Sequence, residues 1–251
     1  MNVIYIMWLR QFKRYIRSRS RIVGALGQPL LYLLALGYGF GQVYAQAGKG
    51  NYIQFLAPGI IAMSVLFTSM FNGIEMIWDR QFGFLKETMV APVPRFSIML
   101  GRVLGGATVA TIQGLIVFVL SFAVGFRLHL ANPVAYSFLA VVCMFLISML
   151  FTTLGTAIAS AITDFQGFQL IMGFVVMPTY FLSGAIFPLA NLPIAMKIVT
   201  RIDPLTYGVD GLRGSLIHAN QFHLGLDIGI LTVLTLLLLA IASYLFSKIQ
   251  I

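Results

Sequence analysis

Six long stretches without a charged side chain constrain the fold of this sequence more than any other feature. A helix needs about 20 residues to cross the hydrocarbon core of a bilayer, so each stretch accommodates one crossing and none comfortably holds two. The stretches run 22–48, 50–74, 103–126, 128–163, 165–196 and 228–247. The sequence therefore predicts six membrane-spanning helices.

Composition supports an all-α integral membrane protein. Hydrophobic residues make up 59% of the 251 residues and charged residues only 9%, whereas soluble domains carry about 25% charged residues. The one cysteine, Cys143, excludes an internal disulfide. We expect a single transmembrane domain over 1–251, with spans at 22–44, 55–77, 98–126, 133–161, 168–187 and 227–247.

The distribution of Lys and Arg predicts the orientation. With an even number of spans, both termini lie on one side. That side also receives the loop after the second span, and it collects 11 of the 16 Lys and Arg residues. Positive charge favours the cytoplasmic side. We therefore expect both termini and this loop in the cytoplasm, and we assign the net charge of +9 to membrane orientation and not to nucleic-acid binding.

Residues 2–18 form an amphipathic pattern. Tyr5, Trp8 and Phe12 recur at helical spacing, while Arg10 and Arg17 fall on another face. The pattern predicts a helix in the headgroup plane with its basic face toward anionic lipid. A simple positive topology anchor is the alternative, and the two roles are compatible.

The loop between the second and third spans is short, charged and helical. Helix-favouring residues run from Asp79 to about Met89, and Pro92 and Pro94 then end the helix. Four Lys or Arg residues in 78–104 exclude burial in lipid. We expect this helix at the membrane surface, where a cytoplasmic partner can reach it.

The segment 183–226, before the last span, is apolar but interrupted by three prolines. Two short helices fit it, one over about 192–201 and one with Asp203 as N-cap and Pro204 at the first helical position. A broken apolar segment of this kind is tolerated at membrane depth only against protein. We expect a re-entrant outer segment, either a lid over a pathway or packing material.

Chemistry that would power or catalyse a reaction is missing. The only Gly-Lys pair, Gly48-Lys49, has Val43 where a nucleotide-binding P-loop requires glycine. The three histidines lack zinc-binding spacing. Predicted mid-membrane positions hold no carboxylate, which disfavours an ion-coupled carrier. Glu75, at the inner end of the second span, is expected either to pair with Arg80 or Lys86 or to line an inner vestibule.

Several motifs together resemble the permease subunit of a type-2 ATP-binding-cassette (ABC) exporter, the group that contains drug, nodulation-factor and polysaccharide exporters. The most specific are Glu87 followed by VAPVPR (90–95), Gly101 beyond it, and PTYFLSGAIFPLANLP (178–193). The resemblance covers nearly the whole chain and says little about cargo.

The resemblance implies that the helix at about 80–89 is a coupling helix seated in a separate ATPase subunit. It also implies a second permease copy, identical or related, in a bacterial inner membrane, with ATP and magnesium on the ATPase and no cofactor on this chain. The 163–169 turn would be a second contact with the ATPase. The candidate coupling residues are Arg80, Phe84, Leu85, Glu87, Thr88, Met89 and Asp164.

Our leading hypothesis is therefore an exporter permease, without catalytic residues of its own, that moves an apolar, amphipathic or lipid-linked cargo between two copies. The candidate pathway residues, on the second and fifth spans, are Phe67, Phe71, Met172, Met177 and Tyr180. A stand-alone channel or secondary carrier is the alternative. An integral membrane enzyme is disfavoured, because no carboxylate, histidine or cysteine residues converge.

Overall fold

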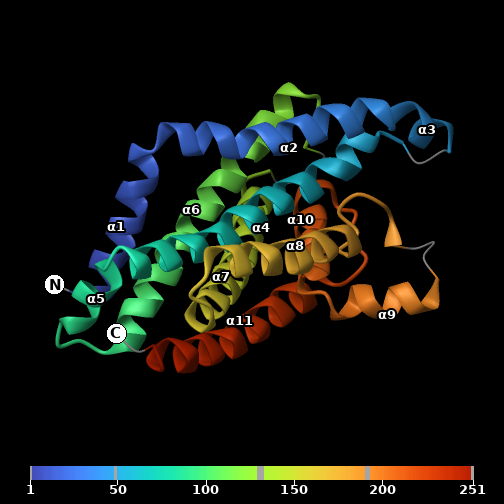
Figure 1. Cartoon of the computed structure of the whole chain (residues 1–251). Coiled ribbons are helices and arrows are strands. Elements are labelled where there is room, and N and C mark those ends of the chain that lie inside the picture. Colours follow the sequence, from blue (N-terminus) through green and yellow to red (C-terminus); the bar gives the residue numbers. More distant parts are fainter. Residues whose placement is uncertain (1, 48–49, 129–132, 190–192, 250–251) are drawn as a thin grey trace.

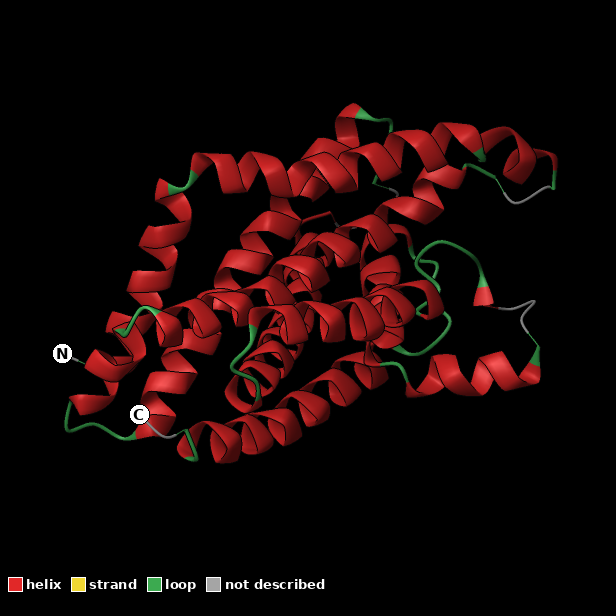
Figure 2. Cartoon of the chain, viewed as in Figure 1, coloured by secondary structure: helices red, strands yellow, loops and turns green. Residues whose placement is uncertain are grey.

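The structure of the chain, a computed structural model, describes residues 2–47, 50–128, 133–189 and 193–249. The described residues form helices joined by turns and contain no strand (Figures 1 and 2). The helices are α1 (Val3–Arg17), α2 (Arg19–Gly39), α3 (Gly41–Gln46), α4 (Tyr52–Gln81), α5 (Phe84–Val90), α6 (Arg95–Ala123), α7 (Pro133–Ala161), α8 (Phe165–Leu182), α9 (Ile194–Ile202), α10 (Pro204–Ile217) and α11 (Leu224–Ser247).

Six helices within the described residues are long and apolar enough to cross a membrane, as the sequence predicts: α2, α4, α6, α7, α8 and α11. Helix α4 is the most enclosed, with 83% of its most apolar stretch buried, whereas α2 and α11 reach only 17%. The chain thus surrounds α4 with α6 and α7 and leaves apolar faces of α2, α8 and α11 uncovered.

Helix α1, α5 and the last turns of α11 lie at the same end of the bundle, and α3 and α9 lie at the other (Figure 1). The Arg95 guanidinium at the start of α6 donates hydrogen bonds to the carbonyls of Ser247 and Ile249. This link fixes the end of α11 beside the loop that contains α5. The arrangement is the one that an even number of spans requires.

Three expected helices have different bounds in the structure. The expected 22–44 helix breaks at Phe40, between Gly39 and Gly41, because glycine in a helix costs about 1 kcal/mol relative to alanine. The expected 168–187 helix already ends at Leu182. The expected 80–89 helix begins later, at Phe84, so Arg80 belongs to α4. Gly83, with φ +81°, makes the turn between these two helices.

One side of α1 packs on α6, where Met7, Gln11 and Tyr15 are buried, whereas Tyr5 of the aromatic pattern is 51% exposed. Trp8 Nε1 donates to the Thr108 hydroxyl of α6 at 3.0 Å. A Cβ added at Gly101 of α6 would lie 2.7 Å from the carbonyl oxygen of Ile4. The close approach of α1 to α6 therefore requires glycine there, as small residues allow between membrane helices.

The segment before α11 contains the two expected short helices. Asp203 is the N-cap of α10, and its carboxylate accepts a hydrogen bond from the Leu205 amide at 2.9 Å, with Pro204 at the first helical position. Helix α10 is enclosed by α4, α7 and α11. In contrast, α9 exposes most of its apolar side chains.

Candidate functional site

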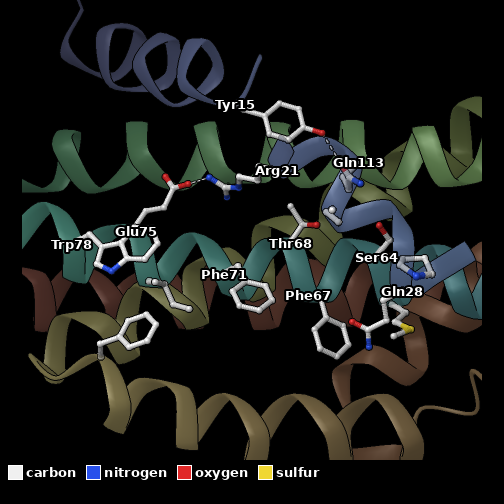
Figure 3. Close-up of a pocket in the computed structure, with 16 residues that line it drawn as sticks. Tyr15, Arg21, Gln28, Ser64, Phe67, Thr68, Phe71, Glu75, Trp78 and Gln113 are labelled. Carbon is white, nitrogen blue, oxygen red and sulfur yellow. Dashed lines mark hydrogen bonds and ion pairs between the residues drawn. The ribbon is translucent and has the colours of Figure 1, made fainter. Parts of the chain in front are cut away.

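A cavity of about 500 Å³ lies between α2 and α4, and residues of α1, α6 and the start of α8 complete its wall (Figure 3). Most of its wall is apolar, and Phe67, Phe71 and Trp78 follow one another along α4. The other lining residues are Tyr15, Arg21, Gly24, Ala25, Gln28, Pro29, Met63, Ser64, Thr68, Ile74, Glu75, Gln113 and Phe165. The volume lies in the usual range of small-molecule sites.

An ion pair closes the polar end of this cavity. The Arg21 guanidinium of α2 contacts the Glu75 carboxylate of α4 and donates a hydrogen bond to the Asn72 side-chain oxygen at 3.3 Å. Asn72 in turn donates to the carbonyl of Gly106 on α6 at 3.1 Å. The first turn of α2 is thereby tied to α4 and α6 at the point where the cavity ends.

A second buried polar contact comes from α1. The Tyr15 hydroxyl donates to the side-chain oxygen of Gln113 on α6 at 2.5 Å. Burial raises the pKa of Tyr15 above its usual range, so the phenol remains a neutral donor at physiological pH. The cavity therefore has one charged corner, at Arg21 and Glu75, and otherwise neutral polar groups.

The charged corner continues into a network of arginines around two carboxylates. Asp79, one helical turn beyond Glu75, accepts contacts from Arg102 at 2.7 Å, Arg14 at 3.3 Å and Arg10 at 3.4 Å, and Arg14 also lies 3.7 Å from Glu75. Glu75, Asp79 and Arg102 are each at most 5% exposed. Because an unpaired buried charge is costly, the network must form as a unit when α1, α2, α4 and α6 pack.

The expected pairing of Glu75 with Arg80 or Lys86 is wrong, and the alternative, that Glu75 lines a vestibule, agrees with its place in the cavity wall. A usable signal existed in the sequence. Arg10, Arg14, Arg17 and Arg21 recur every three or four residues, and Glu75 and Asp79 are four apart. Arg10 and Arg14 of α1 and Arg21 of α2 meet these two carboxylates in the structure.

Helix α5 contacts this network through a cation–π interaction. The Arg10 guanidinium carbon lies 4.8 Å from the centre of the Phe84 ring. Burial is the main cause that lowers the pKa of Arg10, and the nearby Asp79 opposes it. A continuous path of contacts therefore runs from α5 through Arg10 and Asp79 to the Arg14–Glu75 pair at the cavity.

The candidate coupling residues have different surroundings. Leu85 is 3% exposed and anchors α5 in the protein, whereas Phe84 and Glu87 are exposed. Thr88 donates to the carbonyl of Phe84, and Met89 is half-buried. Arg80 lies in the last turn of α4, and Asp164 caps α8 by accepting from the Gly167 amide at 2.7 Å. Phe84, Glu87 and Asp164 are therefore the exposed members of this set.

The candidate pathway residues do not form one group. Phe67 and Phe71 line the cavity, but Met172, Met177 and Tyr180 of α8 do not. Met172 and Tyr180 are buried in packing contacts, while Met177 is 39% exposed. Helical spacing alone did not reveal which face of α8 is enclosed.

A second buried cation, missed in the sequence analysis, stabilises the opposite end of the bundle. Arg213 of α10 is 5% exposed, donates to the carbonyls of Phe55 and Gly184, and lies 4.0 Å from the centre of the Phe55 ring. Burial lowers its pKa to about 10, so it remains charged at neutral pH. This arginine links α10 to α4 and to the turn after α8.

No cluster of three or more histidine, cysteine, aspartate and glutamate side chains suitable for a metal ion occurs among the described residues. Fold and site instead define a multi-pass helical membrane protein with an internal cavity, the architecture of a membrane transport subunit. A family model described as "ABC-2 type transporter" matches residues 2–217. The chain therefore belongs to the ABC-2 type transporter family, as its sequence motifs indicate.

Similar proteins include nodulation proteins and a transport permease. The chain is 29% identical over 228 residues to nodulation protein J of Rhizobium meliloti, covering 90% of this chain and 85% of that protein. It is 30% identical over 210 residues to nodulation protein J of Rhizobium leguminosarum bv. trifolii, covering 82% and 78%. It is 27% identical over 230 residues to the inner membrane transport permease YadH of Escherichia coli, covering 90% and 88%.

Proposed function

We propose that this permease exports an amphipathic or lipid-linked cargo, driven by a separate ATPase subunit that engages α5. The observation that carries the proposal is the continuous contact path from exposed α5 to the cavity between α2 and α4. Movement of α5 by a partner would pull on Arg10 through Phe84 and so disturb the carboxylates beside the cavity. Membership in an ABC transporter family supports an ATPase as this partner.

The composition of the cavity supports the cargo class. Its wall is largely apolar and has one charged corner. Such a site suits a ligand with an apolar body and a polar head. We infer outward transport because the sequence resembles exporter permeases.

The uncovered faces of α2 and α8 support a second permease copy as part of the assembly. Leu31 and Tyr38 of α2 are more than half exposed, as are Leu170 and Phe174 of α8. Phe67 and Phe71 line a cavity beside these faces. Two copies facing each other here would enclose a larger path between them.

Crosslinking from α5 tests the proposal. A photo-crosslinking residue at Glu87, expressed in native membranes, is expected to capture a protein that hydrolyses ATP in the purified complex. The same residue at Ile194 of α9, which is 79% exposed at the other end of the bundle, is the matched control.

Coupling is tested separately in liposomes that contain the permease and the captured ATPase. Glu87→Lys and Phe84→Ala are expected to lower the permease-dependent ATPase rate at least tenfold without changing membrane insertion. Unchanged rates in both variants, or vectorial transport by the chain alone without nucleotide hydrolysis, would contradict the proposal and favour a stand-alone carrier.

A further inference from the structure

A second depression shares only Trp78 with the cavity described above. It lies between α1, the first turn of α2, the end of α4 and the start of α5. It has a volume of about 980 Å³ and we call it the basic groove. Its lining contains five cations, two serines, three aromatic residues and a single carboxylate. The lining residues are Arg10, Lys13, Arg14, Arg17, Ser18, Arg19, Ser20, Trp78, Asp79, Phe82 and Phe84.

The groove holds more positive charge than the carboxylates of the described residues neutralise. Its only carboxylate, Asp79, is already shared by Arg10, Arg14 and Arg102. Within the described part of the chain, Lys13, Arg17 and Arg19 form no ion pair, and all three are exposed. Three cations gathered in a concave site attract an anion more strongly than scattered surface charges do.

The aromatic residues of the groove distinguish an amphiphile from a soluble anion. Trp78, Phe82 and Phe84 are 41%, 78% and 52% exposed. A small water-soluble anion bound in the groove would leave these aromatic rings in contact with water. Tryptophan is enriched where a membrane protein meets lipid headgroups. The groove also lies at the ends of two spans, α2 and α4, where headgroups are expected.

Trp78 connects the groove to apolar surface. The same side chain lines both the basic groove and the cavity between α2 and α4. A molecule with its anionic head among Lys13, Arg17 and Arg19 would therefore meet an apolar surface directly beside its head. An acidic protein segment would match the charge but not this neighbouring apolar surface.

We propose that the basic groove binds the phosphate headgroup of an anionic phospholipid, with Lys13, Arg17 and Arg19 as its ligands and Trp78 against the acyl chain. The Ser18 and Ser20 hydroxyls supply further donors to the phosphate oxygens. Arg10 and Arg14 of α1 line the same groove and pair with Asp79 of α4. A bound lipid would therefore stabilise the contact of α1 with the end of α4. The proposal does not depend on the cargo or on the ATPase.

Trp78 is also the natural reporter, since the chain has only two tryptophans. In the Trp8→Phe variant, Trp78 is the only source of tryptophan fluorescence. The protein is reconstituted in mixed vesicles of phosphatidylglycerol and phosphatidylcholine in which one of the two lipids carries brominated acyl chains. Bromine quenches a tryptophan that it contacts, so the brominated lipid that quenches more is the one enriched beside Trp78.

We expect brominated phosphatidylglycerol to quench Trp78 more strongly than brominated phosphatidylcholine at equal mole fraction. Combining Lys13→Gln, Arg17→Gln and Arg19→Gln is expected to reduce the preference for phosphatidylglycerol at least about tenfold, since each basic residue contributes to binding of anionic lipid. The matched control combines Lys197→Gln, Arg201→Gln and Lys248→Gln, which removes the same charge outside the groove and should keep the preference.

Three results would overturn the proposal: equal quenching by the two lipids, an equal preference in the groove variant and the control variant, or relief of quenching by inorganic phosphate alone. Because Trp8→Phe removes a hydrogen bond to Thr108, native mass spectrometry on the chain with both tryptophans provides a second measurement. Retained phosphatidylglycerol should fall in the groove variant and not in the control variant.

Discussion

At the scale of single residues, buried charges on α4 account for how the helices converge. Asp79 satisfies Arg102, whose side chain is only 4% exposed, and two arginines of α1. A buried ion pair adds little net stability, but removal of one partner leaves the other uncompensated. The pair therefore selects the packing of α4 against α6 more than it strengthens it.

Asp79→Asn should therefore destabilise the protein strongly. We expect a loss of about 3–5 kcal/mol, the usual effect of breaking a buried pair from one side, measured by thermal unfolding in detergent. The double variant Asp79→Leu with Arg102→Met should recover most of this loss, because no buried charge remains. Glu87→Gln, on the exposed surface of α5, is the control, and equal effects at Asp79 and Glu87 would contradict the argument.

Asp203 makes the stability of the α9–α10 corner depend on pH. Burial raises the pKa of its carboxyl from 3.8 to about 7, although the hydrogen bond from the Leu205 amide opposes the rise. The folded state thus holds a proton that the unfolded chain loses at lower pH. The contribution of Asp203 to stability is complete below about pH 4 and is lost as the pH rises to about 7.

We expect the unfolding temperature to fall between pH 5 and pH 8 more in the unmodified protein than in Asp203→Asn. Asparagine keeps the N-cap hydrogen bond but does not titrate, so the difference between the two proteins isolates this carboxyl. Parallel pH profiles would show that Asp203 does not titrate in this range.

At the scale of elements, α1 is held against α6 by close backbone contacts. Two glycines of α6, Gly101 and Gly105, receive the backbone and side chains of α1. The sequence contains this glycine pair, but nothing local to it indicates which helix packs there. Only the tertiary structure identifies α1 as the partner.

Gly101→Val should release α1, because a Cβ would lie 2.7 Å from the Ile4 carbonyl oxygen. We expect faster tryptic cleavage after Lys13 and Arg17. The matched control is Gly229→Val in α11, where an added Cβ meets nothing within 4 Å. Equal protection of α1 in the two variants would contradict the role of this contact.

At the scale of the whole molecule, α1, α5 and the end of α11 lie at the same end of the bundle (Figure 1). One measurement of which side of the membrane this end faces therefore determines the orientation of all three. On a Cys143→Ala background, Ser18→Cys and Ser97→Cys should react with an impermeant thiol reagent only from the cytoplasmic side. Gln46→Cys, in α3 at the other end, should react only from outside. Gly48 follows the first expected span (22–44) and so faces outward in the expected orientation, but it lies outside the described residues. The reverse pattern would place α5 outside the cell and contradict its proposed contact with an ATPase.

The number of spans and the position of the charged loop were predictable, because long apolar stretches have no alternative to a helix in lipid. The Asp203 cap was predictable as well, since capping depends on residues close in sequence. Glu75 and its arginines were not paired correctly, because their partners lie more than 50 residues apart in the chain. The enclosed face of α8 was missed because almost every residue of that helix after Gln169 is apolar.

The sequence by itself determined that this protein is a bundle of membrane-spanning helices with a charged helical loop at the surface. Hydrophobicity, proline and charge act locally, and lipid allows few other solutions. Only the tertiary structure decided which charges are buried together, which face of α1 meets α6, and where a cavity and a basic groove remain. Those features depend on how helices distant in sequence pack, and close packing is set by side chains that no single segment contains.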